Sequence, residues 1–353
     1  MKKHILSIAL SACSIISNAQ LDTTKGNLSF TGYAEVYYSY DFNEPADHNR
    51  PSFFYSHNRH NEFNLNLGFV KGTYNTEKVR ANVALAAGSY MNANYAAEPG
   101  VLKNIYEANA GVKISRKKNV WIDAGIFASH IGFESAVSKD CWGLTRSILA
   151  DNSPNYESGA KLTYITNNSK WLLSGLILNG WQHIQRPDGN NSPAFGTQFT
   201  FTPNSKVSIN YSTFIGNDKP DTSKQMRCFN NLYAMIHFND NIHLTAGFDY
   251  GMEQKVKGSS DYNNWYSPVL ILMVKLSNQW SVTARGEFYN DEHGVIIATG
   301  TENGFQTSGY SLNFDYKIRD NAVWRVEGRT LNSKDKIFIK DNKTQNTNTF
   351  VTT

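Results

Sequence analysis

The sequence predicts an all-β fold, a transmembrane antiparallel up-and-down β-barrel of about sixteen strands. First, segments of roughly ten residues alternate apolar and polar side chains, as strands between lipid and a wet lumen must. Second, very short turns and long loops join these segments in regular alternation. Third, several tryptophans directly follow the short turns. These features favour a membrane barrel over the alternative fold, a secreted soluble all-β protein.

The connections set the number of strands. Seven short ones are rich in the Asn, Asp, Ser and Pro residues that close tight turns, and they lie at 75–78, 115–119, 166–170, 202–206, 239–241, 277–279 and 319–321. Eight longer polar stretches lie at 41–62, 92–104, 130–156, 180–193, 217–227, 251–264, 290–305 and 331–348. Fifteen connections join sixteen strands. The final segment, 349–353, is short, so we expect an incomplete last strand and a partly unpaired seam with the first.

Alternation within the segments gives each strand one apolar face. In the second segment, for example, Leu65 and Leu67 alternate with Asn64. Two segments, 171–178 and 268–276, are instead apolar on both faces. Such segments indicate a packed lumen, a subunit contact or strands buried in a soluble sheet, and the sequence leaves these three readings open.

The first residues have the features of an exported protein. Lys2 and Lys3 precede an apolar stretch at 5–16, and the small residues 17–19 end it, which predicts a signal peptide at 1–19 and a single barrel domain at 20–353. Removing 1–19 takes away two of 34 basic residues and none of the 30 acidic ones, so the net charge falls from +4 to +2. Cys13 offers an alternative, a lipoprotein processing site. No apolar run approaches the roughly 18 residues that a membrane helix needs.

Tryptophan positions predict one membrane rim. Trp171, Trp280 and Trp324 each stand within a few residues after a short turn, where amphipathic rings form a girdle at headgroup level in contact with outer-membrane lipid. Trp121 has a similar place, but its alternation with Val120 turns it toward the lumen.

Charged residues occupy the inward phase of several strands. The best lumen candidates are Arg80, Arg285, Glu287, Arg325, Glu327 and Arg329. The last five stand on the thirteenth and fifteenth predicted strands, which could present a basic strip to an anionic solute. The alternative is that such charges pair across strands and brace the wall, and for most of them we expect this role.

The stretch 130–156 is the longest loop and the best candidate for a constriction folded into the channel. Its candidate residues are Phe133, Glu134, Lys139, Asp140, Trp142 and Arg146. Its many large apolar side chains favour burial rather than exposure. Packing on other loops, or a latch to another subunit, explains the same composition equally well. Cys141 in this loop and Cys228 could form one disulfide in an oxidising periplasm, and the sequence does not decide whether they do.

An enzymatic function has little support in the sequence. Ser129 and His130 are only neighbours in sequence, and no G-x-S-x-G motif occurs. His57 and His60 lack an adjacent cluster of metal ligands. We expect no enzyme, no cofactor, no metal and no nucleic-acid partner. Larger energised transporters have about 22 strands and a plug domain, whereas only about eight residues lie between the predicted signal peptide and the first strand here.

Several loop stretches carry a family resemblance. They are 50–61 (Arg-Pro-Ser-Phe-Phe-Tyr-Ser-His-Asn-Arg-His-Asn), 97–100, 125–135, 142–154 and 215–220. Over nearly the whole chain the sequence resembles the OmpL-like outer-membrane beta-barrel porin family. The resemblance implies an outer-membrane location and a pore function, and it supplies no substrate or catalytic residues. The short last strand departs from the usual pattern, in which a terminal aromatic residue is recognised by the barrel assembly machinery.

A barrel of sixteen strands is wide enough to hold a water-filled channel. The sequence therefore predicts a porin that passes small hydrophilic solutes or ions by diffusion. The alternative is a plugged structural or adhesive barrel whose external loops bind a partner. Solute, ion preference and oligomeric state stay open, although similar-sized porins are commonly homotrimers.

Overall fold

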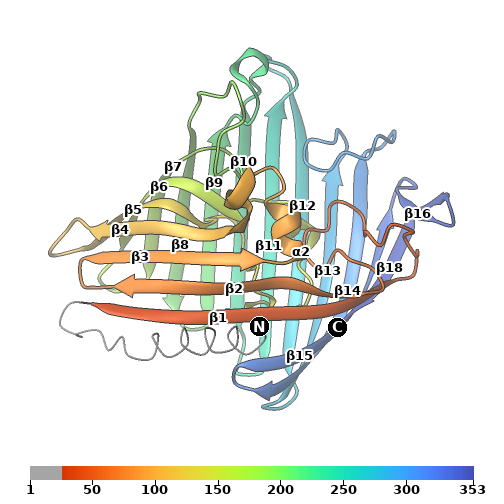
Figure 1. Cartoon of the computed structure of the whole chain (residues 1–353), viewed down its shortest axis with the longest axis horizontal. Helices are drawn as coiled ribbons and strands as arrows, with labels where there is room; N and C mark the ends of the chain where they lie inside the picture. Colours follow the sequence, from red (N-terminus) through yellow and green to blue (C-terminus); the bar gives the residue numbers. More distant parts are fainter. Residues whose placement is uncertain (1–25) are drawn as a thin grey trace, which may run out of the picture.

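The computed structural model describes residues 26–353, so the predicted signal peptide and Cys13 lie outside the described part. Sixteen antiparallel strands form a closed barrel (Figure 1). They are β1 (Asn27–Asp41), β2 (Phe63–Asn75), β3 (Val79–Ala87), β4 (Ile105–Lys113), β5 (Asn119–Ala128), β6 (Tyr156–Ile165), β7 (Trp171–Leu178), β8 (Ala194–Asn204), β9 (Val207–Gly216), β10 (Arg227–His237), β11 (Ile242–Gln254), β12 (Tyr262–Lys275), β13 (Trp280–Asp291), β14 (Phe305–Arg319), β15 (Ala322–Ser333) and β18 (Thr347–Thr352). The predicted fold class and strand number are confirmed.

Short and long connections alternate as predicted. Six of the seven turns fall within two residues of their expected positions; for example, β6 ends at Ile165 and β7 begins at Trp171. The turn expected at 202–206 is shorter, because β8 extends to Asn204. The long loops also contain pieces that were not predicted from the sequence. These are α2 (Ser89–Asn94), α3 (Ile148–Asp151), the 3₁₀ turns η1 (Gly100–Asn104), η2 (Ser138–Asp140) and η3 (Asp221–Ser223), and a hairpin of β16 (Phe338–Lys340) and β17 (Lys343–Gln345). Between residues 26 and 353 no helix is long and apolar enough to cross a membrane.

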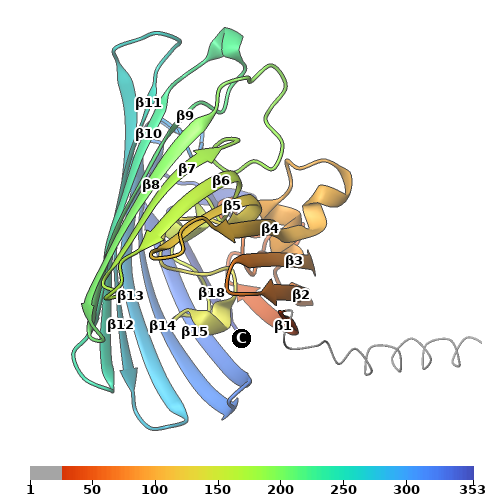
Figure 2. The same ribbon diagram turned by 90° about the vertical axis from the view of Figure 1, so that its left-hand side faces the viewer.

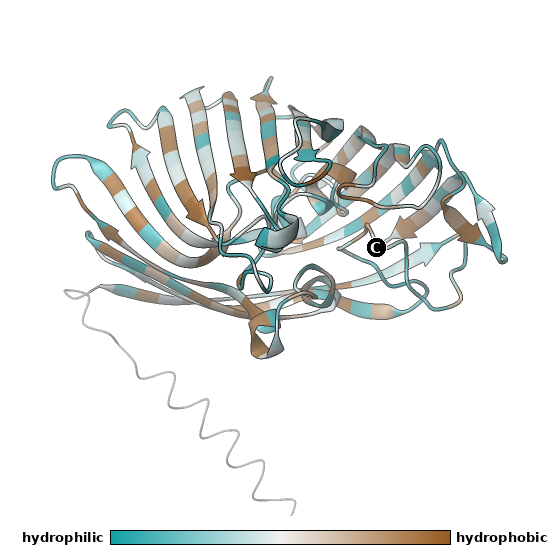
Figure 3. Cartoon of the chain, turned by 90° about the horizontal axis from the view of Figure 1, so that it is seen from above, coloured by the Kyte–Doolittle hydropathy of each residue, from teal (hydrophilic) through white to brown (hydrophobic). Residues whose placement is uncertain are grey.

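Alternation along the strands separates the two faces of the wall (Figure 3). Outward side chains such as Phe30, Val70 and Leu85 are 66%, 64% and 56% exposed, because no protein covers them, and lipid takes that place. Inward neighbours such as Ser39 and Leu67 are buried. The wall therefore has the lipid-out pattern that the sequence predicts, except in β2. There an extra residue opposite Glu35 and Val36 reverses the alternation, so Leu67 faces inward and its predicted common face with Leu65 is wrong.

The seam between the first and last strands is short. β18 pairs with β15 from Asn332↔Thr347 to Glu327↔Thr352, but with β1 only from Ser39↔Thr352 to Asp41↔Phe350. The Thr353 backbone N–H and C=O add bonds to Tyr38 at 2.9 and 2.8 Å. The last strand is thus hydrogen-bonded to the first over a short part of β1's length.

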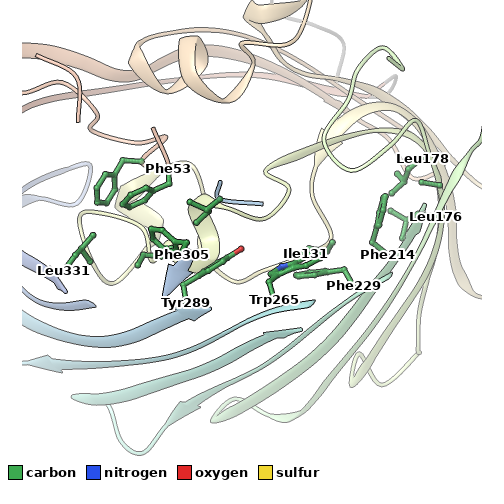
Figure 4. Packing of buried hydrophobic residues seen from close by; sticks show 14 of the residues in the cluster. Phe53, Ile131, Leu176, Leu178, Phe214, Phe229, Trp265, Tyr289, Phe305 and Leu331 are labelled. Carbon is green, nitrogen blue, oxygen red and sulfur yellow. The ribbon is translucent and has the colours of Figure 1, made fainter. Parts of the chain in front are cut away.

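Apolar side chains fill the interior near the long-loop end of the barrel (Figure 4). Leu176 and Leu178 of β7 face inward and pack there with Phe214. On β12, Val269 and Ile271 pack against the loop between β5 and β6. The two segments that are apolar on both faces therefore mark a packed lumen, one of the three readings that the sequence left open.

Candidate functional site

The loop between β5 and β6, residues 129–155, lies inside the barrel, and we call it the inner loop. Its helix α3 lies between the two sides of the wall in Figure 2, and Ser147 caps that helix by accepting a bond from the Ala150 N–H. The loop touches β12 and β13 through α3. Backbone polar groups of a buried loop need hydrogen-bond partners. Inward-facing side chains of the wall supply many of these partners here.

Arg325 on β15 holds the middle of the inner loop. Its guanidinium donates to the carbonyl oxygens of Cys141 (2.9 Å), Trp142 (3.0 Å) and Gly143 (3.2 Å). Asp315 on β14 accepts two further bonds from Arg325, at 2.7 and 2.8 Å. Arg325 also donates to the Ser138 carbonyl, so one planar group satisfies four loop carbonyls, and the neighbouring carboxylate balances its charge.

Thr145 forms a second attachment point. Its backbone N–H and hydroxyl donate to the two carboxylate oxygens of Glu327, at 2.7 and 2.8 Å. Arg285 on β13 donates to the Thr145 carbonyl at 2.6 Å and pairs with Glu327 at 2.7 Å. The loop backbone therefore completes an ion pair between two wall strands.

Glu287 and Arg329 form the third attachment point of the inner loop. The Ile148 N–H donates to Glu287 at 2.7 Å, and Arg329 donates to Glu287 at 2.6 Å and to the Arg146 carbonyl at 2.9 Å. Both side chains are fully buried in their ion pair. Charges at such depth persist only when they are paired and hydrogen-bonded.

These attachments change what the predicted lumen residues do. Arg285, Arg325 and Arg329 face the barrel interior as the alternation predicts, but they are only 4%, 6% and 2% exposed. The inner loop covers them, so β13 and β15 present no bare basic strip to a solute. Their observed contacts fit the bracing role, with the inner loop as the braced part.

His130 fixes the first end of the inner loop. Its Nδ1 lies 2.9 Å from both carboxylate oxygens of Glu157, and its Nε2 lies 2.9 Å from the Thr213 carbonyl oxygen. Burial lowers the pKa of His130, but the charge and hydrogen bond of Glu157 outweigh that effect and raise it overall. Both ring nitrogens face acceptors, which suits the imidazolium form.

We therefore expect the barrel to lose stability as the pH rises through the pKa of folded His130. A His pKa raised on folding contributes stability that is complete below the ordinary value of 6.5 and disappears above the raised value. The free energy of unfolding of the wild type, measured from pH 6 to 9 in detergent micelles, should fall more than that of His130→Gln. His293, which is exposed, supplies the control His293→Gln. Equal pH slopes in all three proteins would contradict the prediction.

The wall opposite the attachments carries the charges that water can reach. Lys71 pairs with Glu107 at 2.7 Å and Arg80 pairs with Asp123 at 2.5 Å. In each pair the basic side chain is the more exposed one, 25% against 15% and 32% against 7%. Arg80 was among the residues predicted from the sequence. Lys71 was not, although its alternation with the lipid-facing Val70 places it inward.

Two further lysines on this wall, Lys113 and Lys161, are partly exposed. Across the described chain neither has an ion-pair partner within 4.0 Å. Lys161 lies over the Phe127 ring at 4.6 Å. The basic excess that a solute can meet therefore lies on β2 to β6 rather than on β13 and β15.

The six predicted constriction residues divide into two groups. Lys139 and Asp140 form an exposed pair at 3.4 Å, and Lys139 and Trp142 line a cavity of about 590 Å³ at the short-turn end. Phe133, Glu134 and Arg146 line a smaller cavity of about 280 Å³ between the inner loop and the wall, with Tyr106 and Tyr233 opposite. All six thus belong to a loop inside the lumen.

Arg146 and Glu134, which line the smaller cavity, keep polar atoms without a hydrogen bond. These are the buried Nε and Nη1 of Arg146 and the buried Oε1 of Glu134, which lies 4.0 Å from Nη1 of Arg285. Burial raises the pKa of Asp151 to about 6, although the charge of Arg146, 3.7 Å away, opposes that rise. Polar groups of both signs therefore face the narrow space beside the inner loop.

The three tryptophans of the predicted rim are exposed where their strands begin. Trp171, Trp280 and Trp324 are 42%, 43% and 51% exposed at the starts of their strands, as a rim would require. Trp121 lies instead under the Arg80 guanidinium at 4.3 Å, on the lumen side.

Cys141 and Cys228 are free thiols. The disulfide that the sequence left undecided therefore does not form in this structure.

The residues weighed for catalysis are held in structural contacts. Ser129 donates to Glu157 at 3.2 Å, and His57 Nε2 lies 2.5 Å from Glu35. Within residues 26–353 no group of three or more His, Cys, Asp or Glu side chains could hold a metal ion. The polar residues of the lumen instead position a loop and line a passage.

A sixteen-stranded wall with lipid-facing apolar residues and a loop bound inside the lumen defines the class of outer-membrane porins. The chain belongs to the family described as "Putative beta-barrel porin-2, OmpL-like", whose model matches residues 27–353. The predicted family, location and porin function are thereby confirmed. No curated protein matches the chain.

Solved porin structures share the fold at low sequence identity. An anion-selective porin from Comamonas acidovorans has a TM-score of 0.59 and 10% identity, over 93% of this chain and 98% of that one. OmpT of Vibrio cholerae has the same TM-score and identity over 94% and 98%. The outer membrane channel DcaP of Acinetobacter baumannii has a TM-score of 0.57 and 10% identity over 93% and 96%. At such identity the likeness supports the barrel architecture alone.

Proposed function

We propose that this porin passes small hydrophilic solutes and ions by diffusion between the inner loop and the wall of β2 to β6, with a mild preference for anions. The observation that carries the proposal is where the inner loop is attached: it is hydrogen-bonded to β9 and β10 through His130 and Gly132 and to β13 and β15 through the wall arginines. Arg285, Arg325 and Arg329 bind it on β13 and β15, whereas Lys71 and Arg80 on the other side keep exposed charge. Basic groups lining a narrow passage favour anions.

The inner loop is the constriction in this proposal. Phe133 lies against Tyr233 of β10, with ring centroids 5.3 Å apart, so the loop reaches from its attachments toward the opposite wall. Glu134 and Arg146 supply polar atoms of both signs at the narrow point. The proposal contains no catalytic step and no cofactor, since the polar residues act by contact and charge alone.

The plugged barrel remains a second candidate because of one observation. Apolar side chains from several loops and strands, including Phe53, Ile131 and Trp181, form one cluster near the long-loop end. Such a layer obstructs water if it extends across the whole lumen. A trimer is a further proposal about assembly, supported by a structure of V. cholerae OmpT in a trimer form with a TM-score of 0.56.

Single-channel recording in a planar bilayer tests the function directly. We expect the refolded protein to give stable open steps, and a salt gradient to give a reversal potential that leans toward anions. Folding is checked beforehand by the heat-sensitive mobility of the barrel in electrophoresis. Silence from verified folded protein would favour the plugged barrel, and a cation-leaning potential would overturn the proposed preference while leaving the pore intact.

Replacing Lys113 and Lys161 together by Gln should reduce the anion preference. Both lysines face the passage without an ion-pair partner in the described structure. Their removal therefore lowers the positive potential, and no carboxylate loses an ion-pair partner. We expect the anion-to-cation permeability ratio to fall roughly twofold, with unchanged strand content. Lys170→Gln, in the exposed turn between β6 and β7, is the matched control. An unchanged ratio in the double variant would place the solute path elsewhere.

A further inference from the structure

A separate cavity of about 600 Å³ opens among the long loops and is not part of the passage just described. We call it the outer cavity; its lining comes from residues 41–53, 297–299, 337–339 and 348. These stretches belong to the loops after β1, β13 and β15, together with the ends of β1 and β18. The cavity thus lies at the mouth of the barrel, where a solute arrives first.

Arg50 is the basic group of this cavity, whose lining also includes the carboxylates of Asp41 and Asp47. It is 4% exposed, and its guanidinium lies over the rings of Phe350 and Phe54 at 3.5 and 4.1 Å. Nη1 donates to the His57 carbonyl at 2.9 Å. Stacking on two rings and one backbone bond hold the planar group in a single orientation.

The remaining edge of Arg50 is unused. Nε and Nη2 are buried and have no hydrogen-bond partner, and Oδ1 of Asn348 in the same lining is also without one. The nearest carboxylate is Asp41, whose Oδ2 lies 3.8 Å from Nε, beyond hydrogen-bond distance. The Asp41 carboxylate instead accepts three bonds, two from Asn348 Nδ2 at 2.7 and 2.9 Å and one from the Asn43 N–H.

The charge of Arg50 is therefore compensated only in part by the protein. Burial lowers the pKa of Arg50 to about 10, although Asp41 opposes that effect. Nε and Nη2 form the edge of a guanidinium that binds a carboxylate through two parallel bonds. Buried donors of this kind are rarely left without a partner, and Arg50 lies in the lining of the cavity.

Much of the remaining lining is apolar, beside polar residues such as Asn49 and Thr299. Phe53, Ile297 and Phe338 are 7%, 7% and 1% exposed, and Ile339 at the rim is 64% exposed. A concave site with apolar walls and a few convergent polar groups is typical of small-molecule binding. The apolar walls exclude a bare inorganic ion as the best occupant, because such an ion gains nothing from them.

We propose that the outer cavity binds a small organic anion, with its carboxylate on the Nε–Nη2 edge of Arg50 and its apolar body against Phe53, Ile297 and Phe338. This inference goes beyond the diffusion function, because binding here needs no conduction. The stretch 50–61, which carries part of the family resemblance, thereby acquires a chemical role through Arg50 and Phe53.

Fluorine NMR of the full-length protein in detergent micelles tests the site with 4-(trifluoromethyl)benzoate as the probe. Its neutral analogue 4-(trifluoromethyl)benzamide has nearly the same shape without the charge. We expect the carboxylate to bind saturably and at least about tenfold more tightly than the amide, since only the anion forms two charge-assisted bonds. Equal affinity for the two probes, or no saturable binding of the carboxylate up to millimolar concentration, would overturn the proposal.

Three variants locate the binding. Arg50→Lys keeps the positive charge but loses the two-donor edge, and should weaken carboxylate binding about tenfold. Ile339→Glu places a negative charge at the exposed rim and should weaken it several-fold without touching the packed walls. Val256→Glu, at a site 63% exposed in another loop, should leave it unchanged. A folded Arg50→Lys protein that binds like the wild type would overturn the proposal; if that variant does not fold, an unaffected Ile339→Glu protein would do so.

The failure of this site is distinguishable from the failure of the pore. Open single-channel steps with no probe binding reject the outer cavity alone. Probe binding without open steps rejects the diffusion channel alone, and it assigns the cavity to a plugged barrel that captures organic anions.

Discussion

Replacing residues 133–151 of the inner loop by a short Gly-Ser linker is expected to raise the single-channel conductance about threefold or more, because an unobstructed sixteen-stranded lumen is several times wider than a loop-filled one. The replaced stretch holds both Phe133, which lies against Tyr233, and the three points attached to Arg325, Glu327 and Glu287. The wall charges uncovered by the change would meet water rather than apolar surroundings. The barrel should therefore still fold.

Conductance in a planar bilayer, compared with the wild type at the same salt concentration, measures this effect. A comparable shortening of the exposed loop at 255–261, between β11 and β12, is the control and should leave conductance unchanged. Equal conductance with and without the inner loop would show that the loop does not narrow the path. A larger conductance in the control variant would place the constriction at the barrel mouth.

The wall was predictable because its signals are local. Tight-turn residues and a two-residue alternation fix where each strand begins, ends and faces, so β6 and β7 were placed to within a residue of Ile165 and Trp171. The same alternation showed that Arg285 and Arg329 face inward. It could not show what covers them, because their partners Thr145 and Arg146 are about 140 and 183 residues away in sequence.

Loop structure escaped prediction for the same reason. The outer cavity depends on Arg50 stacking on Phe350 at the other end of the chain, a contact without any periodic signal. Lys71 on β2 was missed for a different reason. The alternation that groups Leu65 with Leu67 also assigns Lys71 to the lipid face, and the irregularity of β2 opposite Glu35 and Val36 reverses that alternation.

Arg329→Met is expected to destabilise the barrel by about 3 kcal/mol, because removing one partner of a buried ion pair leaves the other charge uncompensated. Arg329 and Glu287 are both fully buried at 2.6 Å. The loss is limited by what Glu287 retains, namely Arg285 at 3.3 Å and the Ile148 N–H at 2.7 Å. Urea unfolding in detergent micelles, followed by tryptophan fluorescence, measures the change in the free energy of unfolding.

Two further proteins separate the cost of an unpaired charge from the loss of a side chain. Lys317→Met breaks an ion pair with Asp320 in which the side chains are 50% and 98% exposed, so we expect a change within about 0.5 kcal/mol. Arg329→Met combined with Glu287→Gln removes both charges, and the amide oxygen of the introduced glutamine can still accept from the Ile148 N–H. If the buried charge causes the loss, this double variant is more stable than Arg329→Met alone. If it is less stable, Arg329 acts mainly by holding the Arg146 carbonyl, and the inner loop rather than the ion pair determines the stability of this wall.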